Sequence, residues 1–283
     1  MLASSSAFVL PLADGRACAV RIAVPPGPPP EAGWPLACVL DAHQFDAMRD
    51  DPAGLPGLLV GVAPGEPADR AWDYTPRLRG RPAPPPGITG RAPARLDGAA
   101  GFPSPPRIAG HAAAWLRALD RVLDRVAAEY RLDGRRRVFC GHSLGALFGL
   151  YAMTHRPDAF DGYVLSSPSV WWGNRHAVRL LRRRREWLCA RGLPALGVFL
   201  TVGEHEQGLG PDDADADPDE QARRLALRRA RGMVDGMHEL AAEFARCPGL
   251  RLRSAVLPGR SHRTASRDAL MPGWRWLLEG AHG

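Results

Sequence analysis

The sequence predicts an α/β protein whose mainly parallel central sheet is flanked by helices on both faces. Short apolar runs typical of strands alternate with segments of helical periodicity along most of the 283 residues. A chain of this length can bury one large core. Its composition, 45% hydrophobic and 24% charged, is that of a packed globular protein and excludes a disordered chain.

Seven segments carry the apolar or alternating pattern of β-strands. Turn-forming residues or helical segments separate them, and each is short enough for a strand. They are residues 17–24, 36–41, 58–63, 137–140, 162–166, 197–202 and 250–257. Because helical patterns lie between most of them, we expect crossover connections and therefore parallel pairing.

Two of the helical segments show a clear apolar stripe. Apolar side chains recur every three or four residues in 115–130 and again in 227–244. The stripes consist of Trp115, Leu116, Leu119, Val122, Leu123, Val126 and Tyr130, and of Leu227, Ala230, Met233, Val234, Met237, Leu240, Ala241 and Phe244. We interpret both as surfaces that pack on the core, not as cofactor sites.

Two segments interrupt the alternation of strands and helices. Residues 64–106 are dense in Pro, Gly and Arg, which predicts a long loop without regular helix. We interpret it as an insert within a single domain that spans residues 1–283, and as a wall of the substrate pocket. Residues 208–220 are acidic and contain Gly and Pro, which predicts a mobile surface loop.

The chain is basic, with a formal net charge of +7. It contains no lysine, so all 37 basic residues are arginines, a bias typical of GC-rich genomes. The arginines are scattered, and their one dense run, 182–185, falls in a helical segment where a solvated face explains it. Since no nucleic-acid recognition motif accompanies the charge, we expect neither nucleic acid nor a membrane as partner.

The cysteines predict no metal site. Their spacing contains no C-x-x-C pair, so we interpret Cys18, Cys38, Cys140, Cys189 and Cys247 as reduced, mostly buried thiols. We expect no metal and no cofactor. The first twelve residues lack the pattern of an export signal, and no apolar run approaches 18 residues. We therefore expect a cytoplasmic protein, with a periplasmic location left open.

One stretch predicts a nucleophile. Residues 137–151 contain a short apolar strand, the turn Gly-His-Ser-Leu-Gly at 141–145 and an apolar helix. This strand–turn–helix context is the one that a nucleophile elbow requires. Gly141 and Gly145 allow strand and helix to approach closely. Ser143 is thus the predicted nucleophile, and the N–H of Leu144 is a predicted oxyanion donor.

A serine hydroxyl needs a general base, and the base works better when a carboxylate holds it. His262 follows the last predicted strand on a loop, which places it at the same sheet edge as Ser143. The acid is expected after strand 197–202, where Glu204 and Glu206 compete. We favour Glu206, with Glu204 as the alternative, and a Ser/His dyad without an acid stays open.

The second oxyanion donor is expected after strand 36–41. The sequence there is Asp-Ala-His at 41–43, and the backbone N–H of His43 is the candidate. Its imidazole has no partner at metal-ligand spacing, so we do not interpret it as a metal ligand.

Motifs spread over most of the chain carry a family resemblance. They are Val-Leu-Asp-Ala-His at 39–43, Gly-Val-Ala-Pro at 61–64, Arg70 with Asp-Tyr-Thr-Pro at 73–76, Gly-His-Ser-Leu-Gly at 141–145, Ser-Ser-Pro-Ser-Val-Trp-Trp at 166–172, Val-Gly-Glu-His-Glu at 202–206 and Gly-Arg-Ser-His at 259–262. Together they resemble the enterochelin-esterase-like and esterase D-like branch of the α/β-hydrolase superfamily, which includes siderophore esterases.

The resemblance implies an α/β-hydrolase fold with Ser143 and His262 as nucleophile and base. It also implies that Arg70 and Trp171 border the substrate pocket. The chain departs from the family at Ala42, where glycine is frequent, and this difference would shift the oxyanion donor of His43 slightly.

The expected function is hydrolysis of carboxylic esters of a small molecule. Siderophore esters of the trilactone or catecholate type, which the resemblance implies, are the sharper hypothesis, and the arginine-rich segment 64–106 would attract such an anionic substrate. The alternatives are a small-acyl carboxylesterase or thioesterase similar to S-formylglutathione hydrolase, and a catalytically silent binding protein with the hydrolase fold.

Overall fold

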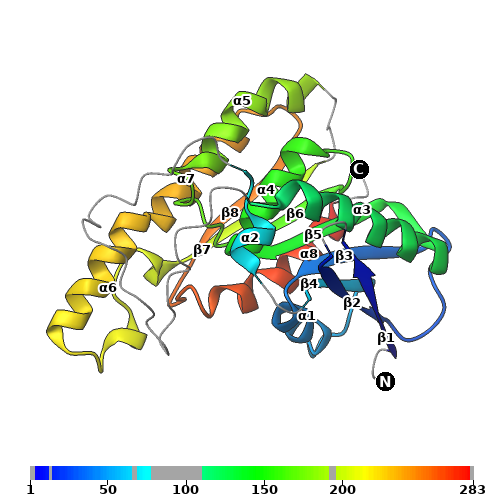
Figure 1. Cartoon of the computed structure of the whole chain (residues 1–283), viewed down its shortest axis with the longest axis horizontal. Coiled ribbons are helices and arrows are strands. Elements are labelled where there is room, and N and C mark those ends of the chain that lie inside the picture. The colour runs from blue at the N-terminus through cyan, green and yellow to red at the C-terminus, as the bar shows by residue number, and fades with distance from the viewer. Residues whose placement is uncertain (1–3, 13–14, 66–68, 78–109, 191–195, 281–283) are drawn as a thin grey trace.

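The computed structural model describes residues 4–12, 15–65, 69–77, 110–190 and 196–280, and its strands form one eight-stranded sheet. The spatial order is β1-β2-β4-β3-β5-β6-β7-β8 (Figure 1). The strands are β1 (Ser4–Pro11), β2 (Ala17–Val24), β3 (Trp34–Leu40), β4 (Leu58–Pro64), β5 (Leu132–His142), β6 (Gly162–Ser166), β7 (Gly197–Gly203) and β8 (Arg251–Leu257).

Six strands are parallel, from β4 through β3, β5, β6 and β7 to β8. Among the described strands, β1 pairs antiparallel with β2, and β2 pairs antiparallel with β4. The seven predicted strands are all present, so the predicted α/β class with a mainly parallel sheet is confirmed. Strand β1, whose first half is serine-rich, was not among the predicted strands. The carboxyl ends of β5, β6, β7 and β8 therefore lie side by side at one edge.

The helices cover both faces of the sheet (Figure 1). They are α1 (Ala42–Arg49), α2 (Arg70–Tyr74), α3 (Ala112–Glu129), α4 (Leu144–His155), α5 (His176–Ala190), α6 (Pro218–Arg231), α7 (Met233–Phe244) and α8 (Leu270–Glu279). Helices α1 and α8 pack on one face. Helices α3, α4 and α7 pack on the other, and α5 packs outside α4 and α7.

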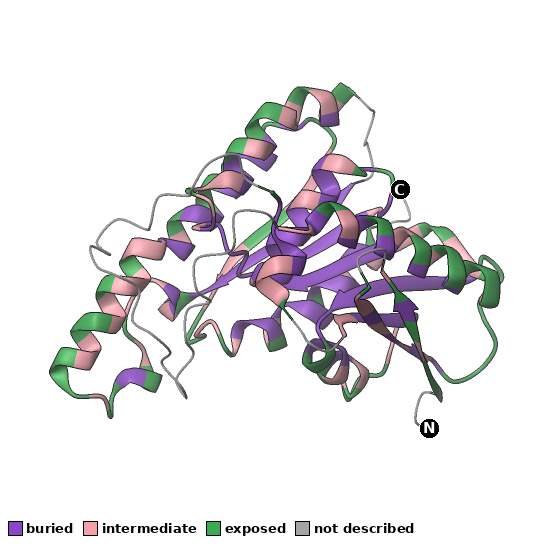
Figure 2. Cartoon of the chain, viewed as in Figure 1, coloured by how far each residue is buried: buried purple, intermediate pink, exposed green. Residues whose placement is uncertain are grey.

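Central strands are buried on both sides, as a parallel sheet between helices requires. All seven residues of β3 are buried (Figure 2). Leu36, Cys38 and Leu40 belong to the core beneath α3 and α4. Ala37 and Val39 alternate with them and belong to the core beneath α1 and α8. The continuous apolar run at 36–40 follows from this two-sided burial.

The prediction of a helical stripe that packs on the core over 227–244 is correct only for its second half. A single helix over 227–244 is wrong, because Gly232 adopts φ 54° and separates α6 from α7. The stripe packs on the core from Met233 onward. Leu227 and Ala230 lie on α6, where none of the fourteen residues, all of them described, is buried. Helix α6 lies outside the layers of the sheet (Figures 1 and 2).

Both predicted loops contain regular structure. Within 64–106 the structure has helix α2, so the absence of regular helix is wrong there, and residues 66–68 and 78–106 lie outside the described part. Within 208–220 it has a 3-10 turn at Pro211–Asp213 and the start of α6. The carboxylate of Asp213 is buried and paired with Arg224 and Arg228. This ion cluster attaches α6 to the loop before it.

The five cysteines all fall within the described residues and are free thiols, with Cys189 the least buried. Among the described helices, none has the length and apolarity that crossing a bilayer would need.

The turn between β5 and α4 requires glycine at position 141. A Cβ there would lie 2.5 Å from the carbonyl carbon and oxygen of Gly145. We expect Gly141→Ala to lower the free energy of unfolding by about 1–3 kcal/mol, because backbone must move to make room. Gly134→Ala is the control, since a Cβ there meets nothing within 4 Å. Equal thermal unfolding temperatures for the two variants would contradict the prediction.

A second prediction concerns His176, the first residue of α5. Burial, followed by the charges of Arg179 and Arg183, lowers the pKa of His176 to about 4. In the unfolded chain the pKa returns to about 6.5, so the unfolded state binds the proton first as the pH falls. This contribution to stability is present above about pH 6.5 and is lost progressively toward about pH 4.

We therefore expect His176→Gln to lose less stability than the wild type when the pH is lowered from about 7.5 to about 5. Urea denaturation midpoints at the two pH values measure the difference, and the titration of the carboxylates cancels in the comparison. An identical drop in both proteins would show that His176 is not the responsible group.

Candidate active site

Ser143 lies on a tight turn between β5 and α4. Its backbone has φ 60° and ψ −117°, a conformation that costs a non-glycine residue on the order of 1–3 kcal/mol. Backbone hydrogen bonds hold it there: the N–H of Ser143 donates to Ser166 O at 3.0 Å, and the N–H of Ser169 donates to Ser143 O at 3.1 Å. The side chain is thereby fixed at the carboxyl edge of the sheet.

The structure brings Ser143, His262 and Glu206 into one hydrogen-bonded chain. His262 Nε2 lies 2.9 Å from Ser143 Oγ, and His262 Nδ1 lies 2.6 Å from Glu206 Oε2. A carboxylate can only accept, so Nδ1 carries the proton and Nε2 is left to accept from the serine hydroxyl. These residues follow β5, β8 and β7, whose ends share one edge.

The two predicted acids have different surroundings. The Glu206 carboxylate is buried, and Glu206 Oε1 accepts from Ser167 Oγ at 2.5 Å and from the Gly203 N–H at 2.7 Å. Glu204 is exposed and instead accepts from the N–H of Gly259 at 2.7 Å. Glu206 is therefore the carboxylate that contacts His262, whereas Glu204 holds the loop that precedes it.

His142 lies beside the pair and is buried. Its ring centroid is 4.7 Å from that of His262, and its Nδ1 is 3.1 Å from Ser166 Oγ. Burial, then the charge of His262, lowers the pKa of His142 well below its ordinary value. His142 therefore stays neutral and adds no positive charge next to His262.

The two predicted oxyanion donors both lie at helix N-termini. Leu144 is the first residue of α4, and His43 is the second residue of α1. Amide groups in the first turn of a helix have no acceptor within that helix and lie at the positive end of its dipole. The helices follow the adjacent strands β3 and β5. The segment after β3 is thus the start of a helix.

The imidazole of His43 is exposed and lies 3.0 Å from Gln44 Nε2. Within the described residues, no group of three or more His, Cys, Asp or Glu side chains could hold a metal ion.

Asp41, which precedes α1, is held by an ion pair. The buried Asp41 has φ 76°, and its carboxylate accepts from Arg70 Nε and Nη2, both at 2.7 Å, and from Tyr74 Oη at 3.1 Å. Burial lowers the pKa of Arg70, but the charge and hydrogen bonds of Asp41 outweigh it and the net pKa is raised. Arg70, expected at the pocket wall, thus binds α2 to the backbone that leads to His43.

Trp171 lies on the turn that follows Ser169, and an arginine that the sequence analysis did not single out covers it. The guanidinium of Arg231, the last residue of α6, is 5.2 Å from the ring centroid of Trp171. Burial lowers the pKa of Arg231 to about 10, and the charge of Glu206 acts in the opposite direction. Arg231 remains a cation near neutral pH and lies within electrostatic range of the site.

Sequence reasoning also missed the contacts of Ser167, Ser169 and Tyr74. A usable signal was the position of Ser167 and Ser169 directly after β6, beside the strand that carries Ser143. Side chains that follow neighbouring parallel strands meet at one edge. The contact of Tyr74 with Asp41 had no such signal, because α2 lies outside the sheet.

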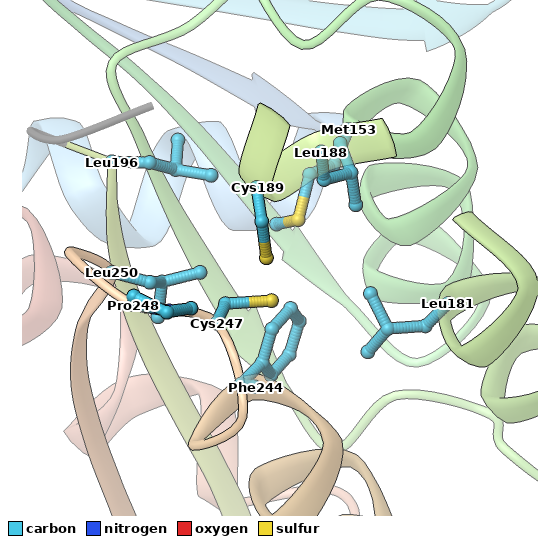
Figure 3. A pocket seen from close by; sticks show the side chains of 9 residues that line it. All are labelled: Met153, Leu181, Leu188, Cys189, Leu196, Phe244, Cys247, Pro248 and Leu250. Atoms are coloured by element: carbon cyan, nitrogen blue, oxygen red, sulfur yellow. The ribbon is translucent and has the colours of Figure 1, made fainter. Parts of the chain in front are cut away.

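A small apolar cavity lies elsewhere, between α4, α5, α7 and the start of β8 (Figure 3). Its lining residues are Met153, Leu181, Leu188, Cys189, Leu196, Phe244, Cys247, Pro248 and Leu250. None of the residues of the candidate site lines this cavity, so it is not part of that site.

Comparison with known proteins gives the family of the chain and its relatives. The family described as "Putative esterase" matches residues 88–244. Among characterised proteins, the chain is 28% identical over 236 residues to the ferri-bacillibactin esterase BesA of Bacillus subtilis. That match covers 72% of this chain and 74% of the relative.

Solved structures share the fold. The siderophore hydrolase EstA from Aspergillus nidulans superimposes with a TM-score of 0.74 at 23% identity, covering 97% of this chain and 94% of that one. The BES protein from Bacillus cereus gives a TM-score of 0.70 at 22% identity, covering 96% and 94%. The predicted α/β-hydrolase fold is confirmed.

The ion pair of Asp41 leads to a stability prediction. Arg70→Met leaves a buried carboxylate unpaired, and we expect the free energy of unfolding to fall by about 2 kcal/mol, less than for a fully buried pair. The expected loss of stability is smaller because the Arg70 side chain is 39% exposed, so solvent weakens the ion pair. In the double variant Arg70→Met/Asp41→Asn the unpaired charge is gone, so part of the lost free energy of unfolding should be recovered. Urea denaturation measures both.

Arg223→Met is the matched control, because Arg223 is 73% exposed in its pair with Glu220. Exposed pairs contribute about 0–1 kcal/mol. The same loss in Arg70→Met and Arg223→Met would contradict the role given to Asp41.

Proposed function

This chain belongs to the "Putative esterase" family and is an ester hydrolase, and from that premise we propose that Ser143, His262 and Glu206 are its catalytic triad. We place the activity in one domain that comprises the whole chain. The observation that carries the proposal is the hydrogen-bonded chain from Ser143 Oγ through both ring nitrogens of His262 to Glu206.

The proposed reaction has two halves. Ser143 Oγ attacks the ester carbonyl while His262 Nε2 takes the hydroxyl proton, and the N–H groups of Leu144 and His43 stabilise the oxyanion. His262 then donates that proton to the departing alcohol, which leaves an acyl-enzyme. A water molecule, deprotonated by His262, hydrolyses the acyl-enzyme and releases the acid. Throughout, Glu206 holds the imidazole in one tautomer and stabilises its cation.

The burial and bonding of Glu206 favour a triad over a dyad. Its Oε1 is held by two donors, Ser167 and the backbone of Gly203, so Oε2 is left to His262. A carboxylate fixed in this way orients the base before the substrate arrives. An exposed Glu204 would offer no comparable restraint.

For the substrate we propose a siderophore ester of the trilactone or catecholate class. The support is the printed activity of the relatives, ferri-bacillibactin esterase and siderophore hydrolase. The pair of Arg231 and Trp171 near Glu206 offers a cation and an aromatic surface to an anionic aromatic ligand. We keep Trp171 and Arg70 as residues that border the substrate.

The triad is tested by Ser143→Ala, His262→Ala and Glu206→Gln, with Glu204→Gln as the matched control. We expect kcat for a p-nitrophenyl ester to fall about 10^4-fold or more in the first two and about 10^3–10^4-fold in Glu206→Gln, because the base loses its tautomer. Glu204→Gln should lose less, since it affects only the loop at Gly259. Labelling with a fluorophosphonate reports the nucleophile directly.

Each outcome separates the alternatives. Labelling that persists in Ser143→Ala would reject the nucleophile, and a Glu206→Gln variant with nearly normal turnover would indicate a dyad. A wild type that neither labels nor turns over would support the silent binding protein. Faster turnover of S-formylglutathione than of a catecholate trilactone would reject the siderophore substrate.

A further inference from the structure

The segment Ser166-Ser167-Pro168-Ser169, called here the SSPS turn, contacts both ends of the proposed triad. It starts with the last residue of β6, between the strand that leads to Ser143 and the strand that leads to Glu206. In the sequence this segment belongs to the motif 166–172 that carries part of the family resemblance. The described contacts point to a role for it in the site.

On one side the SSPS turn holds the nucleophile through three contacts. Ser143 N–H donates to Ser166 O, and Ser169 N–H donates to Ser143 O. The third contact joins two side chains, because Ser169 Oγ lies 3.2 Å from Ser143 Oγ. Ser169 is 2% exposed, so its hydroxyl is shielded from bulk water.

The direction of the hydrogen bond between the two hydroxyls follows from chemistry. Ser143 must give its proton to His262 Nε2, which has a lone pair because Nδ1 donates to the carboxylate. Ser143 Oγ is then left with acceptor capacity only, so Ser169 is the donor. Its hydroxyl therefore points at the oxygen atom that reacts.

On the other side the SSPS turn holds the acid. Ser167 Oγ donates to Glu206 Oε1 at 2.5 Å, and Ser167 N–H donates to Thr201 O on β7 at 2.8 Å. Ser167 has φ 47°, in the left-handed region that a serine seldom adopts. Residues held in such conformations concentrate at functional sites.

We propose that the SSPS turn sets the nucleophile and the acid relative to each other, with Ser169 as a further catalytic residue and Ser167 as the positioning residue of Glu206. This inference rests on the proposed triad and adds two hydroxyl groups to it. In the resting enzyme Ser169 holds Ser143 Oγ toward His262. As Oγ loses its proton to His262 and gains negative charge, the bond from Ser169 strengthens.

The same bond acts in deacylation. When the acyl-enzyme breaks down, Ser143 Oγ leaves the acyl carbon with a negative charge and recovers its proton from His262. A donor already directed at that oxygen stabilises the charge in both halves of the reaction. The contribution therefore belongs to the transition states, and it affects kcat more than KM.

The first test removes only the hydroxyl of Ser169. Ser169→Ala keeps the backbone N–H that binds Ser143 O, so the turn is retained. We expect kcat and the rate constant of fluorophosphonate labelling to fall about five- to tenfold with KM unchanged, the effect of one hydrogen bond. Ser169→Thr restores the hydroxyl and should recover most of the rate. Ser254→Ala, at an exposed position of β8, is the control.

The second test separates the effect of losing the Ser167 hydroxyl from the effect of the strained backbone at this position. Ser167→Ala and Ser167→Gly both lack the donor to Glu206, but glycine adopts a positive φ without strain. We expect both variants to lose kcat about tenfold with unchanged KM, while Ser167→Gly unfolds at the higher temperature. A rate that followed stability in these two variants would reduce Ser167 to a structural residue.

Three results would overturn the inference. They are a change below about twofold in Ser169→Ala, a raised KM with unchanged kcat, or wild-type activity in both Ser167 variants. Failure of the triad itself gives a different result, since Ser143→Ala would then keep its label. Ser169→Ala is measured only against a wild type that labels and turns over, so the two failures are distinguishable.

Discussion

The hydrogen bond from Ser143 N–H to Ser166 O is the interaction on which the rest of the site depends. It continues the parallel pairing of β5 and β6 by one residue beyond the last ladder position, His142 opposite Ser166. Because β7 and β8 follow in the same parallel order, the loops after these strands start from fixed positions. The sheet therefore determines where the loops that carry Glu206 and His262 start. These loops are short, so they keep both side chains near the edge of the sheet.

The strands, the turn that carries Ser143 and the chain order of the site residues could be predicted from sequence, because they depend on local patterns. The apolar runs at 36–40 and 138–140 are visible as strands, since burial on both faces leaves no polar position within them. The elbow needs glycine at 141 for a steric reason that no distant residue changes. The positions of His262 and Glu206 could be predicted because both residues follow strands of a parallel sheet, and the carboxyl ends of such strands lie at one edge.

What escaped prediction depends on contacts between residues far apart in the chain. Gly232 ends a helix whose apolar periodicity continues across it, so periodicity could not locate the break. The ion pair of Asp41 and Arg70 joins residues 29 positions apart. The sequence favoured Glu206 over Glu204, but the burial of Glu206 and its donors from Ser167 and Gly203, which distinguish the two in the structure, leave no pattern in the sequence.

Helix α6 buries none of its described residues, yet its last residue brings the cation that covers Trp171. Substitutions in α6 should change the stability of the core little, because no described residue of α6 is buried. The helix is attached by the ion cluster at Asp213. The hydrogen-bonded chain of Ser143, His262 and Glu206, by contrast, lies at the carboxyl edge of the sheet, whose central strands are buried on both sides. Sequence changes in α6 can therefore replace the cation beside Trp171 without disturbing the hydrogen-bonded chain from Ser143 through His262 to Glu206.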